Sequence, residues 1–306
     1  MGMKAPSIVV CVPTYRRPRQ LLALIKALGV QRGGQAFELL IGNNDSTPVL
    51  ASVRAELPSS IAAHEIFVTE RGVVAVRNAM IDWVLERRPA AQWIACLDDD
   101  QVPDPEWLGR LAEAGRRNDA DLVGGPVHQI AEEATFWSGG STMNDYMPAT
   151  EGPVRYLDAT GNLLVSTAFL RSIELPVFSP AFGRSGGEDY EFFLRARRLG
   201  AAVFWAPDAG VSEVFPLERL TLRGLATRAY ATSAYQARAD LVHGPAWHVL
   251  RTIARSLAVL PAVVVRTLVR RRRLNDAVAM LVRRGAGIAG SIAGLAGQRT
   301  EHYGKD

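Results

Sequence analysis

QWIACLDDD, residues 92–100, joins a mostly apolar run directly to three consecutive aspartates. A short apolar run bounded by polar residues is typical of a strand that is buried on both faces of a parallel sheet. In open sheets of this class, ligands bind beyond the carboxyl ends of the strands, which is where these aspartates stand. Three adjacent carboxylates are costly unless a positive group neutralises them. The stretch therefore predicts an α/β fold with a cation-binding edge.

On both sides of this stretch, apolar runs alternate with segments of helical periodicity. The alternation indicates βαβ units and a doubly wound α/β domain around a parallel sheet. The stretch 126–187 has mixed patterns and is rich in Gly, Ser, Thr and aromatic residues, which favours an acceptor-facing insertion, or an irregular loop, over a core element. We expect strands over 7–12, 37–42, 62–68, 92–97, 121–125 and 201–206, and helices over 18–28, 72–88, 106–117 and 188–199.

The composition limits the class of protein. The chain has 306 residues, of which 48% are apolar and 22% are charged. These values suit a globular protein and exclude a disordered, collagen-like or coiled-coil chain. The two cysteines, Cys11 and Cys96, lie in separate apolar runs, which excludes a disulfide framework and a cysteine zinc site and favours a reducing compartment. The first residues lack the pattern of a signal peptide, so we expect a cytoplasmic protein.

The C-terminal part of the chain differs in charge from the rest. Residues 241–306 contain eleven Lys or Arg and three Asp or Glu, which leaves +8. Residues 1–240 contain 24 basic and 28 acidic residues, which leaves −4. We therefore expect a catalytic domain over 1–240 and a basic extension over 241–306. Anionic membrane lipids and nucleic acid are the candidate partners of such an extension. Of the two, we expect the anionic surface of a membrane and not nucleic acid.

Two apolar stretches, 246–269 and 277–297, make up most of this extension, and four arginines at 270–273 separate them. Arg255 and Arg266 lie inside the first stretch, where each would cost ~2.5–3.5 kcal/mol at the centre of a bilayer. We therefore expect two helices that lie on the cytoplasmic face of the membrane, with the arginine run at the headgroups. The alternative is that the helices pack on the catalytic domain or in an oligomer.

The aspartate triplet admits two interpretations. In an extended chain, Asp98 and Asp100 would point to one side and Asp99 to the other. One or two carboxylates together with substrate phosphates are the usual ligands of Mg²⁺, so the triplet favours a metal-bound diphosphate. The alternative is a solvated acidic turn or a helix cap, because Pro103 and Pro105 follow closely. Neither a G-x-G-x-x-G turn nor a P-loop follows the first strand, which excludes those two kinds of nucleotide site.

Seven short motifs, taken in order, carry a resemblance to a known family. The motifs are V-P-T-Y-x-R (12–17), Asn43-Asn44-Asp45-Ser46, E-R-G-V-V-A-V-R-N (70–78), D-D-D (98–100), G-N (161–162), G-G-E-D (186–189) and P-x-x-R (216–219). With these motifs the chain, from about residue 7 to residue 238, resembles family 2 glycosyltransferases of the GT-A fold. The resemblance implies the GT-A fold of nucleotide-diphospho-sugar transferases and the transfer of a sugar from a nucleotide sugar.

The resemblance assigns roles to residues in these motifs. A divalent ion, Mn²⁺ or Mg²⁺, would be bound by Asp100 and by Glu213, which stands where the family often has a histidine. Arg219 and Arg228 would neutralise the diphosphate, or would be solvated helix residues. Family members usually have Asp at the position of Asn43. The residues that the resemblance assigns to the nucleotide sugar are Pro13, Thr14, Tyr15, Arg17, Asn43, Asp45, Gly72, Arg77, Asn78, Asp98 and Asp99.

Asp189, in the E-D pair, is the expected catalytic base. An acceptor hydroxyl must lose a proton as it attacks the anomeric carbon, so the reaction needs a positioned carboxylate. In the family the aspartate of this pair has that role, and Glu188 would orient the base or bind the acceptor. The alternative is that both acids only favour the start of a helix.

The resemblance implies an inverting glycosyltransferase that moves a hexose from a UDP-linked sugar to a glycan or lipid-linked acceptor, in polysaccharide or glycolipid synthesis. Polymerising members carry a Q-x-x-R-W signature, which this chain lacks, so we expect the addition of single sugars. A sugar-phosphate nucleotidyltransferase is the alternative enzyme, but it needs a glycine- and lysine-rich turn after the first strand. A non-catalytic sugar-nucleotide-binding scaffold at the membrane is the alternative outside enzymes.

Overall fold

The structure is a computed structural model, and it describes residues 7–131, 137, 147–157, 159–183, 186–269 and 274–298. The expectations that concern the arginine run 270–273 lie outside the described residues. By their internal contacts the residues form two compact units. The first unit consists of Met1–His128, Tyr146–Pro180 and Arg195–Glu213, and the second consists of Gln129–Asp145, Ala181–Leu194 and Val214–Asp306.

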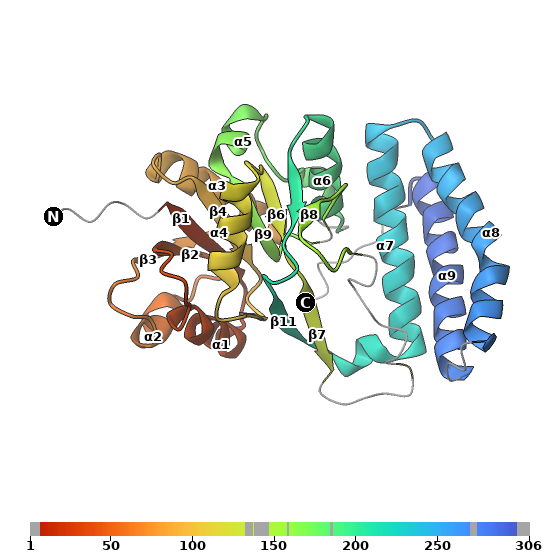
Figure 1. Cartoon of the computed structure of the whole chain (residues 1–306), viewed down its shortest axis with the longest axis horizontal. Coiled ribbons are helices and arrows are strands. Elements are labelled where there is room, and N and C mark those ends of the chain that lie inside the picture. Colours follow the sequence, from red (N-terminus) through yellow and green to blue (C-terminus); the bar gives the residue numbers. More distant parts are fainter. Residues whose placement is uncertain are drawn as a thin grey trace. The chain divides into compact units, whose positions relative to one another are not determined.

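An eight-stranded sheet forms the centre of the first unit (Figure 1). Strand β1 pairs in parallel with β2 and β4, and β2 pairs in parallel with β3, as the alternating pattern predicts. Strand β9 pairs antiparallel with both β4 and β6, so the sheet is mixed. The order is β3 (Ala63–Phe67), β2 (Phe37–Asn43), β1 (Ile8–Thr14), β4 (Trp93–Leu97), β9 (Asn162–Ser166), β6 (Leu122–Gly124), β10 (Val203–Trp205) and β8 (Gly152–Pro153).

The expected strands and helices of the first half of the chain are confirmed. All seven residues of β2 are buried, which agrees with a mostly apolar run that is covered on both faces. The first helix begins at Pro18, whose fixed φ suits a first turn, and it buries Leu21, Leu24 and Leu28. The α-helices up to residue 172 are α1 (Pro18–Gly29), α2 (Leu50–Val53), α3 (Val73–Arg87), α4 (Trp107–Arg117) and α5 (Thr167–Ser172), of which α2 and α5 were not expected.

The prediction of an insertion or a loop for 126–187 is wrong for β9. This strand lies inside the sheet between β4 and β6, and its residues Leu163, Leu164 and Val165 are 1%, 0% and 2% exposed. Only three apolar residues mark it in the sequence, so its pattern is too short to identify a strand. The same stretch also contains β7 (Val127–Ala131), β8 and α5.

Two short strands were not expected. One directly follows the aspartate triplet, and the other directly precedes the late P-x-x-R motif. Strand β5 (Gln101–Pro103) pairs antiparallel with β11 (Val211–Phe215), and Gln101 lies opposite Glu213. Because β5 begins at the residue after Asp100, this pairing fixes the far end of the triplet. The triplet therefore lies between β4, which pairs with β1, and β5, which pairs with β11.

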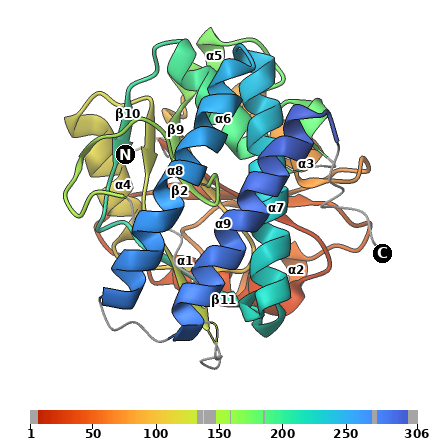
Figure 2. The ribbon, with the colours of Figure 1, turned by 90° about the vertical axis from the view of Figure 1, so that its right-hand side faces the viewer.

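Three long helices form most of the second unit, which also holds the first part of α6 (Glu188–Arg198). Helices α8 (Trp247–Val269) and α9 (Leu274–Leu295) confirm the two helical stretches of the extension. Helix α7 (Leu222–His243) was not expected, and it runs through residue 240, where the sequence predicts a domain boundary. Figure 2 shows α9 between α7 and α8, and α9 packs against both.

Glycines bring α9 close to α7. A Cβ atom on Gly290 would lie 2.1 Å from the carbonyl oxygen of Tyr230, and one on Gly294 would lie 2.3 Å from that of Ala234. Only glycine allows two helices to approach so closely at these points. By length and apolar composition alone, the segment Ala277–Leu295 of α9 is able to cross a membrane, and 22% of it is buried inside the protein.

Candidate functional site

The aspartate triplet forms a tight turn between β4 and β5. The Gln101 amide donates to the carbonyl oxygen of Asp98 at 3.1 Å, and the Gln101 side-chain oxygen accepts from the Asp98 amide at 3.1 Å. The expected extended geometry is therefore wrong, because the chain reverses within the triplet. A Cβ atom on Gly161 would lie 2.6 Å from Asp98 Oδ2, so the turn packs directly on the glycine of the G-N motif.

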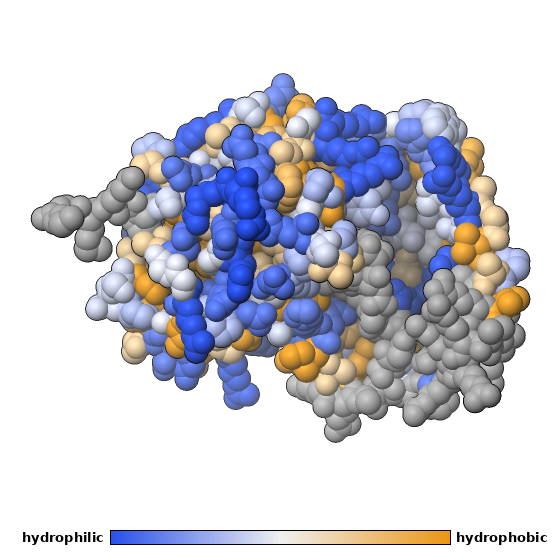
Figure 3. All heavy atoms as spheres, in the orientation of Figure 1, coloured by the Kyte–Doolittle hydropathy of each residue, from blue (hydrophilic) through white to orange (hydrophobic). Residues whose placement is uncertain are grey.

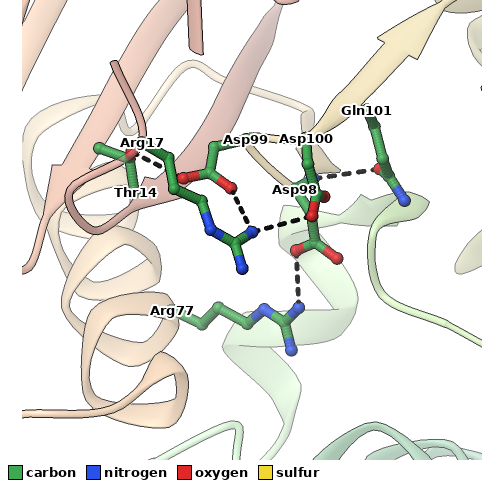
Figure 4. Close-up of polar contacts among 7 residues, drawn as sticks. All are labelled: Thr14, Arg17, Arg77, Asp98, Asp99, Asp100 and Gln101. Atoms are coloured by element: carbon green, nitrogen blue, oxygen red, sulfur yellow. Dashed lines mark hydrogen bonds and ion pairs between the residues drawn. The ribbon is translucent and has the colours of Figure 1, made fainter. Parts of the chain in front are cut away.

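Two arginines and a threonine bind the three carboxylates (Figure 4). Thr14 Oγ1 donates to Asp99 Oδ2 at 2.8 Å. Arg17 Nη1 donates to Asp99 Oδ1 at 3.1 Å and to Asp100 Oδ2 at 2.8 Å. Arg77 Nη2 donates to Asp98 Oδ1 at 2.9 Å. The turn is thus acidic but not simply solvated, since the chain itself supplies positive groups on both sides.

The three aspartates differ in exposure. Asp99 is 5% exposed, and burial raises the pKa of its carboxyl to about 6, against the opposing effects of Thr14 and Arg17. The side chains of Asp98 and Asp100 are 37% and 40% exposed. Two partly exposed carboxylates fit a divalent ion that takes its other oxygen ligands from phosphates. Within the described residues, no three His, Cys, Asp or Glu side chains gather as a complete metal site, and Glu213 completes none.

Asn43 and Asp45 lie in the loop after β2. Asn43 is 1% exposed, and its amide nitrogen donates to the Thr47 carbonyl and to Glu65 Oε1, both at 2.8 Å. Its side-chain oxygen accepts from the Asp45 backbone amide at 2.9 Å. The structure thus places Asn43 beneath the loop, where it holds Asp45, and Glu65 is a supporting residue that the sequence does not reveal.

Two arginines stack on Tyr15 at this loop. The guanidinium carbons of Arg71 and Arg16 lie 4.4 and 5.1 Å from the centre of the Tyr15 ring. Arg16 has a φ of 54° and donates from Nε to Asp45 Oδ2 at 3.0 Å, which lowers the pKa of the Asp45 carboxyl. Arg71 donates to the Asn44 carbonyl at 3.3 Å. Neither arginine was assigned a role from the sequence, although both lie inside the quoted motifs.

The start of α3 is fixed by side chains of two motifs. Gly72 has a φ of 116°, in the region that favours glycine, and its amide donates to Asn44 Oδ1 at 3.0 Å. Asn78 donates to and accepts from the backbone of Phe178, both at 2.8 Å. Arg77 is 7% exposed and lies 5.7 Å from the Phe178 ring. Pro13, Arg77, Asp98 and Phe178 line the same small pocket.

In the second unit, the E-D pair lies beside residues of α7. Gly187 has a φ of 92°, and a Cβ atom there would lie 2.5 Å from the Tyr235 ring. Burial raises the pKa of Tyr235, as do Asp189 and Glu188, while the hydrogen bond to Thr232 and the charge of Arg228 oppose the shift. The guanidinium carbons of Arg219 and Arg228 lie 5.7 and 5.4 Å from the Phe215 ring.

The predicted site residues therefore gather in two sets, one in each unit. The first set consists of residues at the acidic turn, at Tyr15 and in the loop after β2. In the second set, Glu188 and Asp189 directly follow Gly187, which packs on the Tyr235 ring, and Arg228 lies on the same helix as Tyr235. Tyr235 was not predicted, because one aromatic residue in an alanine-rich helix gives no functional signal.

Two family models match the chain. The model described as Glycosyl transferase family 2 matches residues 9–175, and the one described as Glycosyl transferase family group 2 matches residues 93–281. A curated relative, the Succinoglycan biosynthesis protein ExoM of Rhizobium meliloti (strain 1021), is 28% identical in an alignment that covers 96% of this chain and 94% of the relative.

Crystal structures of S. aureus TarS share the fold. TarS 1-349 in complex with UDP has a TM-score of 0.53 at 15% identity, and the match covers 95% of this chain and 92% of that fragment. A longer TarS structure has a TM-score of 0.52 at 14% identity; the match covers 92% of this chain and 55% of that one. The mixed sheet and the flanking helices thus confirm the expected GT-A fold.

Proposed function

The chain belongs to glycosyltransferase family 2, and we propose that it is an inverting enzyme that adds a single hexose from a UDP-linked sugar to a glycan or lipid-linked acceptor. A relative named for succinoglycan biosynthesis supports a place in polysaccharide synthesis. The TarS fragment that shares the fold was solved with UDP, which supports uridine as the nucleoside.

The acidic turn between Arg17 and Arg77 carries this proposal. A nucleotide sugar presents a diphosphate with two negative charges. Guanidinium groups suit that diphosphate as hydrogen-bond donors, and partly exposed carboxylates suit a divalent ion bound to it. The side chains of Asp98 and Asp100 meet Arg77 and Arg17 at 2.9 and 2.8 Å, so both kinds of group stand at one turn.

Asp100, together with Asp98, would hold Mn²⁺ or Mg²⁺. When bound, this ion would stabilise the negative charge that develops on the leaving diphosphate. Arg17 and Arg77 would contact the same phosphates, and Arg219 and Arg228 are the proposed further cations. The base and ribose would lie at the end of β1 and the loop after β2, where Thr14 and Asp45 are held in place. Glu213 is proposed as a ligand only together with phosphate oxygens.

Asp189 would act as the base toward the acceptor. Its carboxylate would take the proton of the acceptor hydroxyl while the oxygen attacks the anomeric carbon, and the bond to the diphosphate breaks on the opposite side. Glu188, which is 5% exposed, would orient this residue. Replacing the base should lower kcat by about 10²–10⁴-fold. Asp189→Asn is therefore expected to lose transfer while UDP binding stays within about twofold of wild type.

We also propose that the C-terminal helices bind the cytoplasmic face of a membrane through α8. Trp247, Leu250, Leu257 and Val265 lie at the spacing of one helix face and are 52%, 52%, 51% and 59% exposed. Arg251 and Arg255 are exposed on the same helix and would meet anionic headgroups. Figure 3 shows orange apolar residues beside blue hydrophilic ones at the edge where Figure 1 places α8.

The test of the activity is a panel of nucleotide sugars, with membranes that carry lipid-linked acceptors, assayed with and without Mn²⁺. Release of UDP together with a labelled acceptor is the expected result. A nucleotidyltransferase would instead release pyrophosphate from a nucleoside triphosphate and a sugar phosphate. A scaffold would bind UDP in calorimetry but release no nucleotide from any donor, and either result would overturn the proposal.

A further inference from the structure

The turn that carries the E-D pair rests on one helix, α7. Three residues of α7 contact three different residues of the segment 187–191. The Tyr235 ring lies against Gly187, where an added Cβ would be only 2.5 Å away. The Tyr190 hydroxyl donates to Asp240 Oδ1 at 3.0 Å, and His243 Nε2 lies 2.8 Å from Glu191 Oε1. The residues on both sides of Asp189 are thus fixed to the same helix.

The contact between Gly187 and Tyr235 fixes where α6 begins. With a φ of 92°, Gly187 has a backbone conformation that other residues rarely adopt, and its missing side chain leaves room for the ring. Helix α6 starts at the next residue, Glu188. A change in the ring would therefore move the first turn of α6, which contains Asp189.

The two polar contacts fix the rotation of that first turn. Glu191 is 3% exposed, and the side chain of its partner His243 is 16% exposed. Burial raises the pKa of the Asp240 carboxyl, and its bond from Tyr190 opposes this shift. Buried polar groups are costly without their partners, so each pair favours one orientation of α6 strongly over others.

We propose that Tyr235, Asp240 and His243 are positioning residues for Asp189, which makes α7 the support of the catalytic base. The inference rests on the proposed function of Asp189. A base must lie within about 2.6–3.2 Å of the oxygen whose proton it takes, and a misplacement of about 1 Å costs on the order of 10²-fold in rate. Contacts at the residues that flank Asp189 are therefore suited to control kcat while they leave donor binding unchanged.

Substitutions in α7 test this proposal through the split between kcat and binding. Tyr235→Ala and His243→Ala should lower kcat by about 10- to 100-fold, since each lets the base move. The Kd of UDP with Mn²⁺, measured by calorimetry, should stay within twofold. Tyr235→Phe keeps the ring and should keep kcat within threefold. Tyr230→Phe is the matched control on α7, because the Tyr230 hydroxyl donates to Gln298, at 3.2 Å, and not to α6.

A second measurement does not depend on activity. Hydrogen exchange of the amides of 187–194 should become at least tenfold faster in Tyr235→Ala and in the milder Tyr190→Phe, but not in Tyr235→Phe or Tyr230→Phe. Unchanged exchange and unchanged kcat in a folded Tyr235→Ala protein would overturn the proposal, as would a parallel loss of UDP affinity. A wild-type chain that transfers no sugar would refute the proposed function instead, and the exchange data would still decide whether α7 holds this turn.

Discussion

The Arg17 guanidinium donates to the Asp100 carboxylate at 2.8 Å, so the proposed metal ligand has a positive partner in its own chain. The same nitrogen, Nη1, also lies 3.1 Å from Asp99 Oδ1. A divalent ion that binds Asp100 must share this carboxylate with Arg17 or displace the Arg17 guanidinium from it. In the proposed site Arg17 would therefore oppose binding of the ion alone and, once phosphates are present, would contact them.

Arg17→Gln should bind Mn²⁺ alone more tightly and the donor more weakly. Removal of one positive charge beside two carboxylates is expected to lower the Kd of Mn²⁺ by about three- to tenfold. Loss of a diphosphate contact should raise the KM of the donor at least about tenfold. A titration that follows free Mn²⁺ by electron paramagnetic resonance measures the first effect. Arg110→Gln, a surface variant at an i,i+4 ion pair, is the control, and unchanged Mn²⁺ affinity in Arg17→Gln would contradict the competition.

Asp99 should make the folded protein less stable as the pH rises from about 4 to about 6. Burial raises the pKa of its carboxyl to about 6 from 3.8, so the folded state binds the proton more tightly than the unfolded state. Its contribution is therefore fully present below about pH 4 and is lost as the pH rises through 6, by up to about 3 kcal/mol.

Asp99→Asn isolates this contribution, because the amide oxygen still accepts from Thr14 but has no proton to lose. Urea unfolding in EDTA at pH 4.5 to 8 measures the free energy of unfolding of both proteins. The value for the variant minus that for wild type should increase as the pH rises. Both proteins contain the other carboxyl groups, so the contribution of these groups to the pH dependence cancels in the difference. A difference that stays constant with pH would show that Asp99 does not titrate in this range.

The sequence predicts the elements whose pattern is local. The strand runs that end at Thr14, Asn43 and Leu97 are mostly apolar, and the structure confirms them. Strand β9 has only three apolar residues, and its position depends on pairing with β4 and β6, which lie elsewhere in the chain. Helix α7 buries mainly alanines, so its apolar face has little contrast with the rest of the helix.

The candidate site, too, could be predicted from the sequence only where its features are local. The types of its charged residues follow from the motifs, but their partners do not. Asp98 meets Arg77 and Asp100 meets Arg17, over sequence separations of 21 and 83 residues. Tyr235 supports the E-D turn through ring packing on Gly187, a contact that no motif encodes. Pairings of this kind are set by the fold, so they become visible only when the strands and helices are in place.

Gly161→Ala should disturb the acidic turn while leaving the fold intact. The added Cβ would lie 2.6 Å from Asp98 Oδ2 and 2.6 Å from Gln101 Nε2, so both side chains must move, although the backbone need not. We expect the KM of the donor to rise at least about tenfold, because the carboxylates no longer lie at the phosphates. Gly152→Ala is the control, since a Cβ there meets nothing within 4 Å. Equal donor KM values for the two variants would argue against a role for this turn.

Leu250→Glu together with Leu257→Glu should release the protein from anionic vesicles. Both side chains are about half exposed on α8, so the change should leave the fold intact, and it places two negative charges where the apolar face would enter the headgroup region. We expect sedimentation with vesicles of phosphatidylcholine and phosphatidylserine to weaken by at least about tenfold. These point variants replace a truncation after residue 240, which would cut α7 and remove its packing against α9.

Val30→Glu together with Leu199→Glu is the matched control, because both residues are exposed apolar positions of the first unit. High salt should weaken binding of the wild type, since part of it comes from Arg251 and Arg255. Vesicle binding that survives both the double substitution and high salt would remove α8 as the membrane-binding face.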